Sequence, residues 1–178
     1  LIPIGGGYEP LRGFVESTFP YWQTLNADQF TILMLPSAFS YDPYSLSSAE
    51  LLDNSYLADL RRHQLEEACR EVLGLRNIEG MPCRVTVLPV YTREAAQSDL
   101  LTQFFSDDPA AIYFLGGDQL NAMNIIANTP LEQAIITAFQ NGVPLGGNSA
   151  GAALLAEQMI VGYAPDRDAN TGLHEDAI

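Results

Sequence analysis

The sequence predicts an α/β fold with a mainly parallel sheet and helices on both faces. Short, continuously apolar runs of the length of buried strands alternate with stretches of helical periodicity, and no repeat or linker interrupts them. The predicted strands are residues 1–4, 30–36, 84–90, 111–115 and 143–145. In such folds, ligands bind beyond the carboxyl ends of the strands. The last two strands end there in glycine pairs, so we expect these two junctions to face one another and to form the functional site.

Helices are predicted in most of the intervals between strands. Residues 12–22 form an aromatic-rich segment that we interpret as a short helix or a loop over the sheet. Residues 92–105 are expected to be helical, with a threonine cap at their start. Thr-Pro-Leu-Glu at residues 129–132 is a capping box with proline in the first helical position. That helix should run to Asn141 and stop at Gly142.

Residues 48–73 form the longest helical stretch, and Gly74 should close it. Three-and-four spacing predicts an inward face made of Leu57, Leu60, Gln64, Ala68 and Val72. Charged residues occupy the opposite face. His63 lies among them, so we interpret it as a solvated surface histidine. Before this helix, residues 37–48 form a loop rich in tyrosine, serine and proline that is long enough to cover a cleft.

Charge and hydrophobicity exclude several classes of function. The chain has 22 acidic and 8 basic residues, which gives a formal net charge of −14. Nucleic acids and anionic membrane surfaces both require basic patches, so we expect neither as a partner. No apolar run reaches the roughly 18 residues needed to span a bilayer. The acidic balance is compatible with a cationic substrate, but solubility or a salt-adapted source explains it more simply.

The length and the termini bear on domain organisation. We expect a single catalytic domain over residues 1–178, incomplete at both ends, because the chain begins at Leu1 inside a predicted strand. We expect a cytoplasmic location, with secretion left open because a signal sequence could have preceded Leu1. Cys69 and Cys83 are too few for a disulfide framework and lack metal-ligand spacing. The oligomeric state stays open, and a homodimer is a common outcome for soluble enzymes.

The motif with the clearest chemistry is Gly-Asn-Ser-Ala-Gly at residues 147–151, a G-x-S-x-G nucleophile elbow. Such an elbow needs glycine on both sides because the serine sits on a sharp, strained turn between a strand and a helix. We expect that helix from Ala150 to about residue 160. Its N-terminal N–H groups and positive dipole end would face charge that develops beside Ser149. This motif predicts a serine hydrolase.

A serine nucleophile also needs donors for the oxyanion. The backbone N–H of Ala150 is one candidate, and an N–H of the Gly116-Gly117 turn is the natural second, because glycine allows close approach to a substrate carbonyl. Asp118 and Gln119 project from the same turn and could grip the substrate. An ordinary turn with a helix cap at Asp118 explains this stretch equally well.

The catalytic base is harder to place. A serine requires a base, and only two histidines are present. His63 lies on an outer helix face. His174 follows Ser149 in a suitable order, but it sits in a polar run with no strand before it, which favours a terminal loop histidine. Either the base lies beyond residue 178, or this chain is not a complete enzyme.

Three further motifs carry a family resemblance. They are Phe-Leu-Gly-Gly-Asp-Gln at residues 114–119, Thr-Pro-Leu at 129–131 and Gly-Gly-Asn-Ser-Ala-Gly-Ala-Ala at 146–153. Together with the opening Ile-Gly-Gly-Gly turn, they resemble the cyanophycinase and dipeptidase E family of serine peptidases, peptidase family S51. The resemblance covers roughly residues 1–160. It is closer to the cyanophycinase branch because of Gln119 and the Ala-Gly-Ala-Ala run.

The resemblance implies a fold like that of class I glutamine amidotransferases, a flavodoxin-like three-layer sandwich, with serine replacing cysteine at the elbow. It also implies hydrolysis of peptide bonds that involve an aspartyl residue, and in cyanophycinases the substrate is a β-aspartyl-arginine polymer. A small peptide or a cyanophycin-like polymer is therefore the expected partner. By position, Ser149 would be the nucleophile, Gly117 and Ala150 would supply the oxyanion hole, and Gln119 would belong to the substrate pocket. No metal or organic cofactor is indicated.

The sequence departs from the family in its base. The family carries that base in a later motif resembling Asp-Gln-His-Phe, followed by arginines of the pocket, and nothing in this chain matches it. The family's acid lies between nucleophile and base, where Asp166 and Asp168 are equal candidates. Two alternatives stay open: a non-catalytic S51-like relative that binds peptides, and an esterase-type serine hydrolase with the same elbow. Against the esterase, no histidine-glycine-rich loop follows an early strand.

Overall fold

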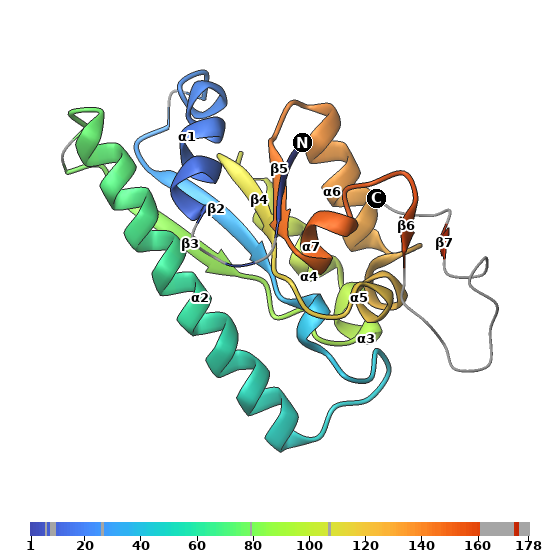
Figure 1. Cartoon of the computed structure of the whole chain (residues 1–178). Coiled ribbons are helices and arrows are strands. Elements are labelled where there is room, and N and C mark those ends of the chain that lie inside the picture. The colour runs from blue at the N-terminus through green and yellow to red at the C-terminus, as the bar shows by residue number, and fades with distance from the viewer. Residues whose placement is uncertain are drawn as a thin grey trace.

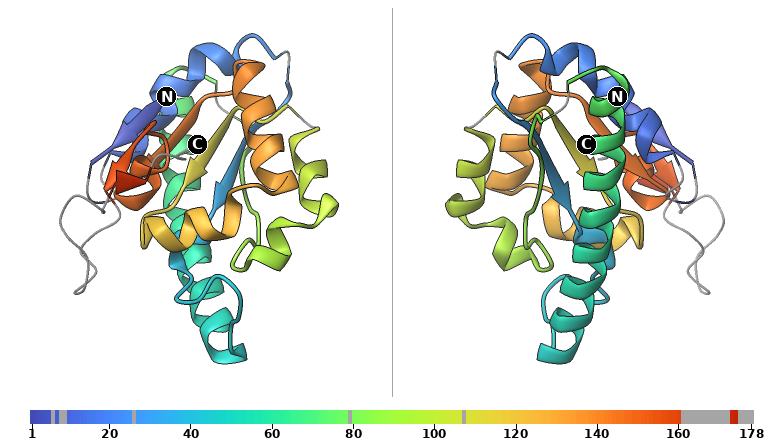
Figure 2. Two further views of the ribbon diagram at one scale, coloured as in Figure 1. Left: turned by 90° about the vertical axis from the view of Figure 1, so that its right-hand side faces the viewer. Right: turned by 90° about the vertical axis from the view of Figure 1, so that its left-hand side faces the viewer.

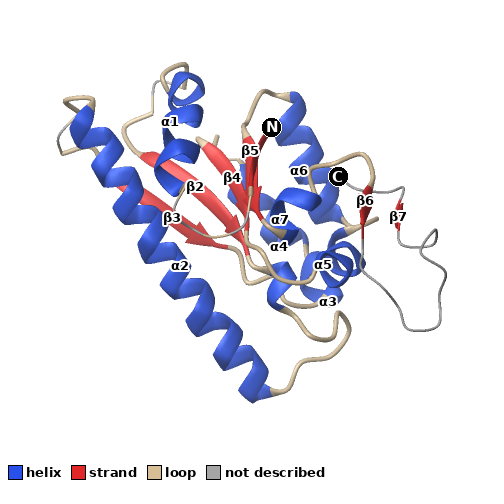
Figure 3. Cartoon of the chain, in the orientation of Figure 1, coloured by secondary structure: helices blue, strands red, loops and turns tan. Residues whose placement is uncertain are grey.

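A computed structural model describes residues 1–159 except 6, 8, 9, 26, 79 and 107, together with the backbone of residues 160, 173 and 174. Its centre is a five-stranded parallel sheet with the strand order β1-β5-β4-β2-β3 (Figures 1 and 3). The strands are β1 Ile2–Ile4, β2 Phe30–Leu35, β3 Cys83–Val87, β4 Ala111–Phe114 and β5 Leu145–Asn148. The predicted α/β class and its parallel sheet are confirmed.

Helices cover both faces of the sheet. They are α1 Leu11–Trp22, α2 Ser48–Leu75, α3 Arg93–Ala96, α4 Asp99–Thr102, α5 Gln119–Ile126, α6 Pro130–Gln140 and α7 Ala150–Ala153, with the 3₁₀ turns Ser37–Phe39 and Gln103–Phe105. Figure 2 shows α1 and α2 on one side of the sheet and α5 and α6 on the other. Among the helices of the described residues, none has both the length and the apolar character that crossing a bilayer requires.

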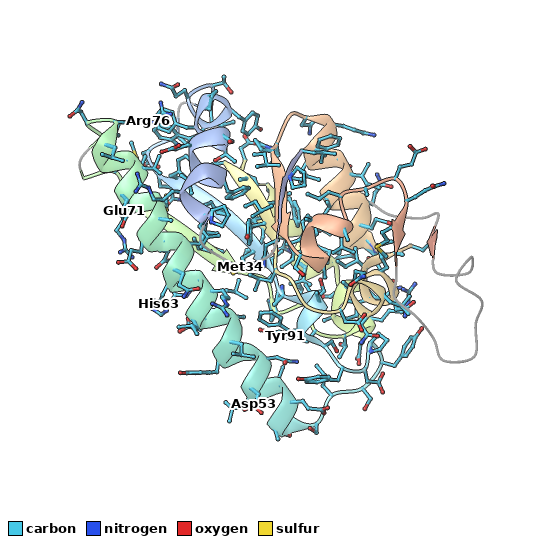
Figure 4. All side chains as sticks on the ribbon, in the orientation of Figure 1. Met34, Asp53, His63, Glu71, Arg76 and Tyr91 are labelled. Atoms are coloured by element: carbon cyan, nitrogen blue, oxygen red, sulfur yellow. A yellow bond between two sulfur atoms is a disulfide. The ribbon has the colours of Figure 1, made fainter. Side chains whose placement is uncertain are left out.

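The sheet buries side chains on both faces, which explains the continuous apolar runs of the sequence. In β2, Ile32 and Met34 belong to the core under α1 and α2, whereas Leu33 and Leu35 belong to the core under the other helices. Successive side chains of a strand point to opposite faces, so each strand contributes to both cores. Figure 4 places Met34 at the centre of the molecule. The architecture is the expected three-layer sandwich.

The face that α2 buries differs from the predicted one. The buried residues are Asn54, Ala58, Leu65, Ala68, Cys69, Val72 and Leu73. Leu57 and Leu60, which were expected to face inward, are each 41% exposed. The amino-terminal half of α2 extends past the sheet (Figure 1), so no strand covers these side chains there. Gly74 lies inside the helix, one residue before its end.

Threonine caps were predicted at the start of two helices, and both caps are present. Only one of the two helices has the predicted length. Thr129 accepts a hydrogen bond from the N–H of Glu132, and α6 gives way to Gly142 in a left-handed conformation, as expected. Thr92 also caps its helix, yet α3 ends after one turn. Ser98 starts α4 by accepting from the N–H of Leu100. This second cap competes with a continuous helix, which explains the break.

A disulfide that nothing in the sequence indicated joins Cys69 of α2 to Cys83 at the start of β3. The two Cα atoms are 6.2 Å apart, and Cys69 is fully buried. The bond closes a short loop of sequence separation 14 between a helix and the edge strand of the sheet. A crosslink of this span restricts the unfolded chain and thereby stabilises the fold.

Removing the disulfide should lower the free energy of unfolding by about 3 kcal/mol, the usual effect of closing a loop of this size. Urea unfolding with and without dithiothreitol measures the effect. The double variant Cys69→Ala/Cys83→Ala is the control, because dithiothreitol should not change its midpoint. A wild-type midpoint that is equally insensitive to reduction would contradict the crosslink.

Candidate functional site

Ser149 occupies the turn between β5 and α7. Its backbone has φ 51° and ψ −119°, a conformation that a non-glycine residue adopts only where its surroundings impose it. Its neighbours Asn148 and Ala150 are buried, whereas Ser149 itself is exposed. Its N–H donates to the carbonyl oxygen of Ile4 in β1 at 3.3 Å. The strained, exposed serine has the geometry of a nucleophile elbow.

The two elbow glycines allow α7 to pack directly on the end of β4. A Cβ atom added to Gly151 would overlap the carbonyl oxygen of Phe114, and one added to Gly147 would overlap that of Gly151. β5 continues through Gly147 to Asn148, three residues beyond the predicted end, because its backbone pairs with β1 and β4 on both sides. Glycine on both sides of the serine is therefore a packing requirement of this fold.

The two glycine junctions face one another, as predicted. A Cβ atom on Gly116 would lie 3.1 Å from the Cβ of Ser149. Asn148, which is 2% exposed, ties the junctions together. Its Oδ1 accepts hydrogen bonds from the N–H of Gly116 and from the hydroxyl of Tyr113, both at 3.2 Å. Nothing in the sequence singled out Asn148 for this role.

Among the described residues, neither the backbone N–H of Gly117 nor that of Ala150 donates to a backbone carbonyl. The turn that carries Gly117 is held against the 3₁₀ turn after β2, because the N–H of Asp118 donates to the carbonyl oxygen of Ala38 at 2.7 Å. A Cβ atom on Gly117 would overlap that same oxygen, so only glycine fits here.

Asp118 caps α5, as one of the two interpretations of this turn expected. Its Oδ1 accepts from the N–H of Asn121 at 2.9 Å. Gln119 is the first residue of α5 and is partly buried. Asp118 also lines the cavity beside this turn.

The helix after Ser149 is much shorter than predicted. α7 ends at Ala153 instead of near residue 160, where Met159–Ile160 instead forms a short strand, β6. The N–H groups of Leu155 and Ala156 donate to carbonyls only three residues back, so the last turn tightens and stops. Leu155 and Met159 are buried in the core, and this packing overrides helical propensity. A helix of one turn has almost no macrodipole. Charge beside Ser149 could therefore interact only with individual N–H groups of this turn.

The described side chains include no base for Ser149. His63 projects from the outer side of α2 (Figure 4), where it contacts Arg62 and Asp59 at the surface. The backbone of His174 lies in β7, Leu173–His174, which pairs with β6 in antiparallel fashion. His174 was expected in a terminal loop with no strand before it. That expectation was wrong, because His174 belongs to a strand. Asp166 and Asp168 fall outside the described residues.

A cavity of about 320 Å³ lies beside the glycine turn of β4. Its walls come from Gly116–Asp118, from residues 38–41 after β2, and from Asn54 and Leu57 of α2. The predicted cleft-covering loop therefore supplies one wall through its first residues. This volume is at the lower end for small-molecule sites. Among the residues that line it, Asp118 alone is charged. The described residues contain no group of three or more His, Cys, Asp or Glu that could hold a metal ion.

Comparison with known families identifies the lineage of this site. The family model described as peptidase family S51 matches residues 75–171, which is more than half of the chain. The chain belongs to peptidase family S51. The match includes both glycine junctions and the elbow, whereas Ile4, which accepts a hydrogen bond from the N–H of Ser149, and Ala38, which contacts Gly117, lie outside it.

Individual relatives agree with this assignment. A cyanophycinase of Geminocystis herdmanii is 39% identical over 72 residues, which cover 40% of this S51 chain and 26% of that protein. A cyanophycinase of Trichormus variabilis is 29% identical over 91 residues, which cover 51% and 30%. The crystal structure of a peptidase from an acI-B1 Actinobacterium has a TM-score of 0.65 at 27% identity, covering 89% of this chain and 57% of that one. The chain thus spans only part of the length of each.

Glycine-to-alanine substitution should have opposite effects on the free energy of unfolding at two helical positions of this S51 chain, Gly13 and Gly151. Gly13→Ala in α1 should raise the free energy of unfolding by up to about 1 kcal/mol, because a Cβ there meets nothing within 4 Å. Gly151→Ala should lower it by about 1–3 kcal/mol, because the methyl group would press against Phe114. Urea unfolding of both variants checks the signs. Equal stabilisation by both would show that α7 does not pack on β4.

Proposed function

We propose that this chain carries the nucleophile of a serine peptidase that hydrolyses aspartyl peptide bonds through an acyl-enzyme on Ser149. The single observation that carries the proposal is the exposed, strained Ser149 held against the Gly116-Gly117 turn. Family S51 membership and the similarity to cyanophycinases support the reaction class. The proposed substrate class is a β-aspartyl-arginine isopeptide, as in cyanophycin.

The proposed mechanism uses three groups of this chain. The Oγ of Ser149 attacks the scissile carbonyl carbon, and its proton passes to a base that the described side chains do not supply. The carbonyl oxygen becomes an oxyanion that accepts hydrogen bonds from the N–H groups of Gly117 and Ala150. The base then gives this proton to the nitrogen of the leaving amine, whose departure leaves an acyl-enzyme ester on Ser149. Water hydrolyses this ester, which releases the acid and restores the hydroxyl.

Two alternatives remain as outcomes of the test. A non-catalytic relative would bind peptides at the same turn without turning them over, and the lack of a base among the described side chains favours it. An esterase-type hydrolase would use the same elbow on ester substrates. The backbone geometry of the elbow is common to all three.

The disulfide also bears on location. Disulfides persist mainly in oxidising compartments, so Cys69–Cys83 favours the secreted alternative over the cytoplasmic one. We infer that the protein functions in an oxidising environment. Alkylation of intact cells before lysis, followed by mass spectrometry of the peptides that contain these cysteines, distinguishes the bonded from the free thiols. Free thiols would contradict the inference.

A serine-directed phosphonate probe should label Ser149, and the label should disappear in Ser149→Ala. Labelling is read by mass spectrometry of the protein in its natural length, with circular dichroism as the control that the variant is folded. A β-aspartyl-arginine isopeptide and a short-chain ester are assayed side by side. Cleavage of the ester alone would exclude the peptidase, and a folded wild type that takes no label would exclude every enzymatic reading.

A further inference from the structure

The cavity beside the glycine turn is lined in part by side chains that solvent can reach. Tyr41 lines it and is 78% exposed, and Leu57 lines it and is 41% exposed. Most of the surface of a tyrosine belongs to its ring, so a tyrosine exposed to this extent leaves its ring open to a ligand. Gly117 lines the same cavity and is also exposed. A ligand that enters from solvent can therefore contact the tyrosine and the glycine turn together.

Hydrogen bonds hold the backbone of Tyr41 against α5. The side-chain nitrogen of Asn121 in α5 donates to the carbonyl oxygens of Ser40 and Tyr41, at 3.0 and 3.3 Å. α5 itself begins two residues after Gly117. The backbone of Tyr41 is thus tied to the helix that follows the glycine turn. A contact group that is fixed in this way relative to the reacting centre suits substrate selection.

The segments that form the cavity carry acidic charge only. The sequence has no lysine, arginine or histidine from residue 13 to residue 60 or from residue 94 to residue 166. All residues that line the cavity lie in these two stretches. The acidic residues that lie in or between the lining positions of each stretch are Asp42, Glu50, Asp53 and Asp118. A surface with charge of one sign attracts ligands of the opposite sign, so these segments favour a cation.

The arginines that adjoin these stretches are engaged elsewhere. Arg93 donates from Nη1 to the carbonyl oxygens of Asn124 and Ala127, at 2.7 and 2.9 Å. Arg61 donates from Nη1 to Oε1 of Gln64, further along α2, at 2.8 Å. Neither arginine lines the cavity. Among the described residues that line it, none supplies a positive charge, so the acidic segments are left to attract a cation from solution.

We propose that the cavity receives the arginyl side chain of the substrate, with the guanidinium stacked on the ring of Tyr41 and the methylene stem against Leu57. The inference rests on the proposed peptidase function, in which the scissile carbonyl oxygen lies at the N–H of Gly117 on the same cavity. Guanidinium groups stack on aromatic faces, where the ring attracts their charge, and arginine stems pack on apolar side chains. The exposure of Leu57 and Tyr41 is then explained by the substrate that covers them.

Binding of two matched dipeptides to the Ser149→Ala variant, in its natural length, tests this assignment without turnover. β-Aspartyl-arginine carries the guanidinium, and β-aspartyl-citrulline replaces it by a neutral group of nearly the same shape. Isothermal titration calorimetry should give the lower Kd for the arginyl dipeptide. Adding Tyr41→Leu should raise that Kd by about 3- to 10-fold and change the Kd of the citrullinyl dipeptide little, because only the first depends on charge over the ring. Tyr41→Phe keeps the aromatic face and should preserve the preference for arginine.

Tyr56→Leu is the matched control, because Tyr56 is an exposed tyrosine of α2 that does not line the cavity. It should leave both Kd values unchanged, and circular dichroism checks that each variant is folded. The proposal is overturned if the Ser149→Ala variant binds the two dipeptides equally or binds neither. It is also overturned if Tyr41→Leu weakens both dipeptides by the same factor or weakens neither.

Cleavage of the arginyl dipeptide by the wild type tests the proposed function separately. If the wild type cleaves it but Tyr41→Leu leaves its Kd unchanged, this inference alone fails. If binding discriminates arginine from citrulline through Tyr41 but the wild type cleaves neither dipeptide, the proposed function alone fails.

Discussion

The side-chain oxygen of Asn148 holds the site together. It accepts hydrogen bonds from the N–H of Gly116 and the hydroxyl of Tyr113, and so joins the end of β5 to the end of β4. Asn148 is almost fully buried. A buried amide oxygen that accepts two hydrogen bonds stabilises the fold, whereas an unpaired one would destabilise it. Because the next residue is Ser149, this one oxygen sets the distance between the serine and the glycine turn opposite.

Backbone packing then keeps the donors in place. The close approach of Gly117 to Ala38 and of Gly151 to Phe114 leaves no space for a methyl group, so neither turn can move without losing its contact. Preorganised N–H groups of this kind stabilise developing charge without rearrangement during the reaction. α7 is a single turn, so the proposed oxyanion hole relies on the two individual N–H groups rather than on a long helix dipole.

The sequence predicted the sheet, the elbow and the opposition of the two glycine junctions, because strand length, glycine spacing and caps are local signals. It did not reveal features that depend on distant contacts. The pairing of Cys69 with Cys83 requires knowing that α2 packs on β3, and the exposure of Leu57 requires knowing that α2 extends past the sheet. The early end of α7 likewise reflects packing of Leu155 rather than a stop signal.

The central claim is that Ser149, Gly117 and Ala150 together form a nucleophile with its oxyanion hole. A crystal structure of the phosphonate adduct tests it most directly, because the adduct's P=O oxygen occupies the oxyanion position. The account predicts phosphorus bonded to the Oγ of Ser149 and that oxygen about 2.7–3.1 Å from the N–H nitrogens of both Gly117 and Ala150. An adduct whose oxygen points into solvent, away from the glycine turn, would contradict it.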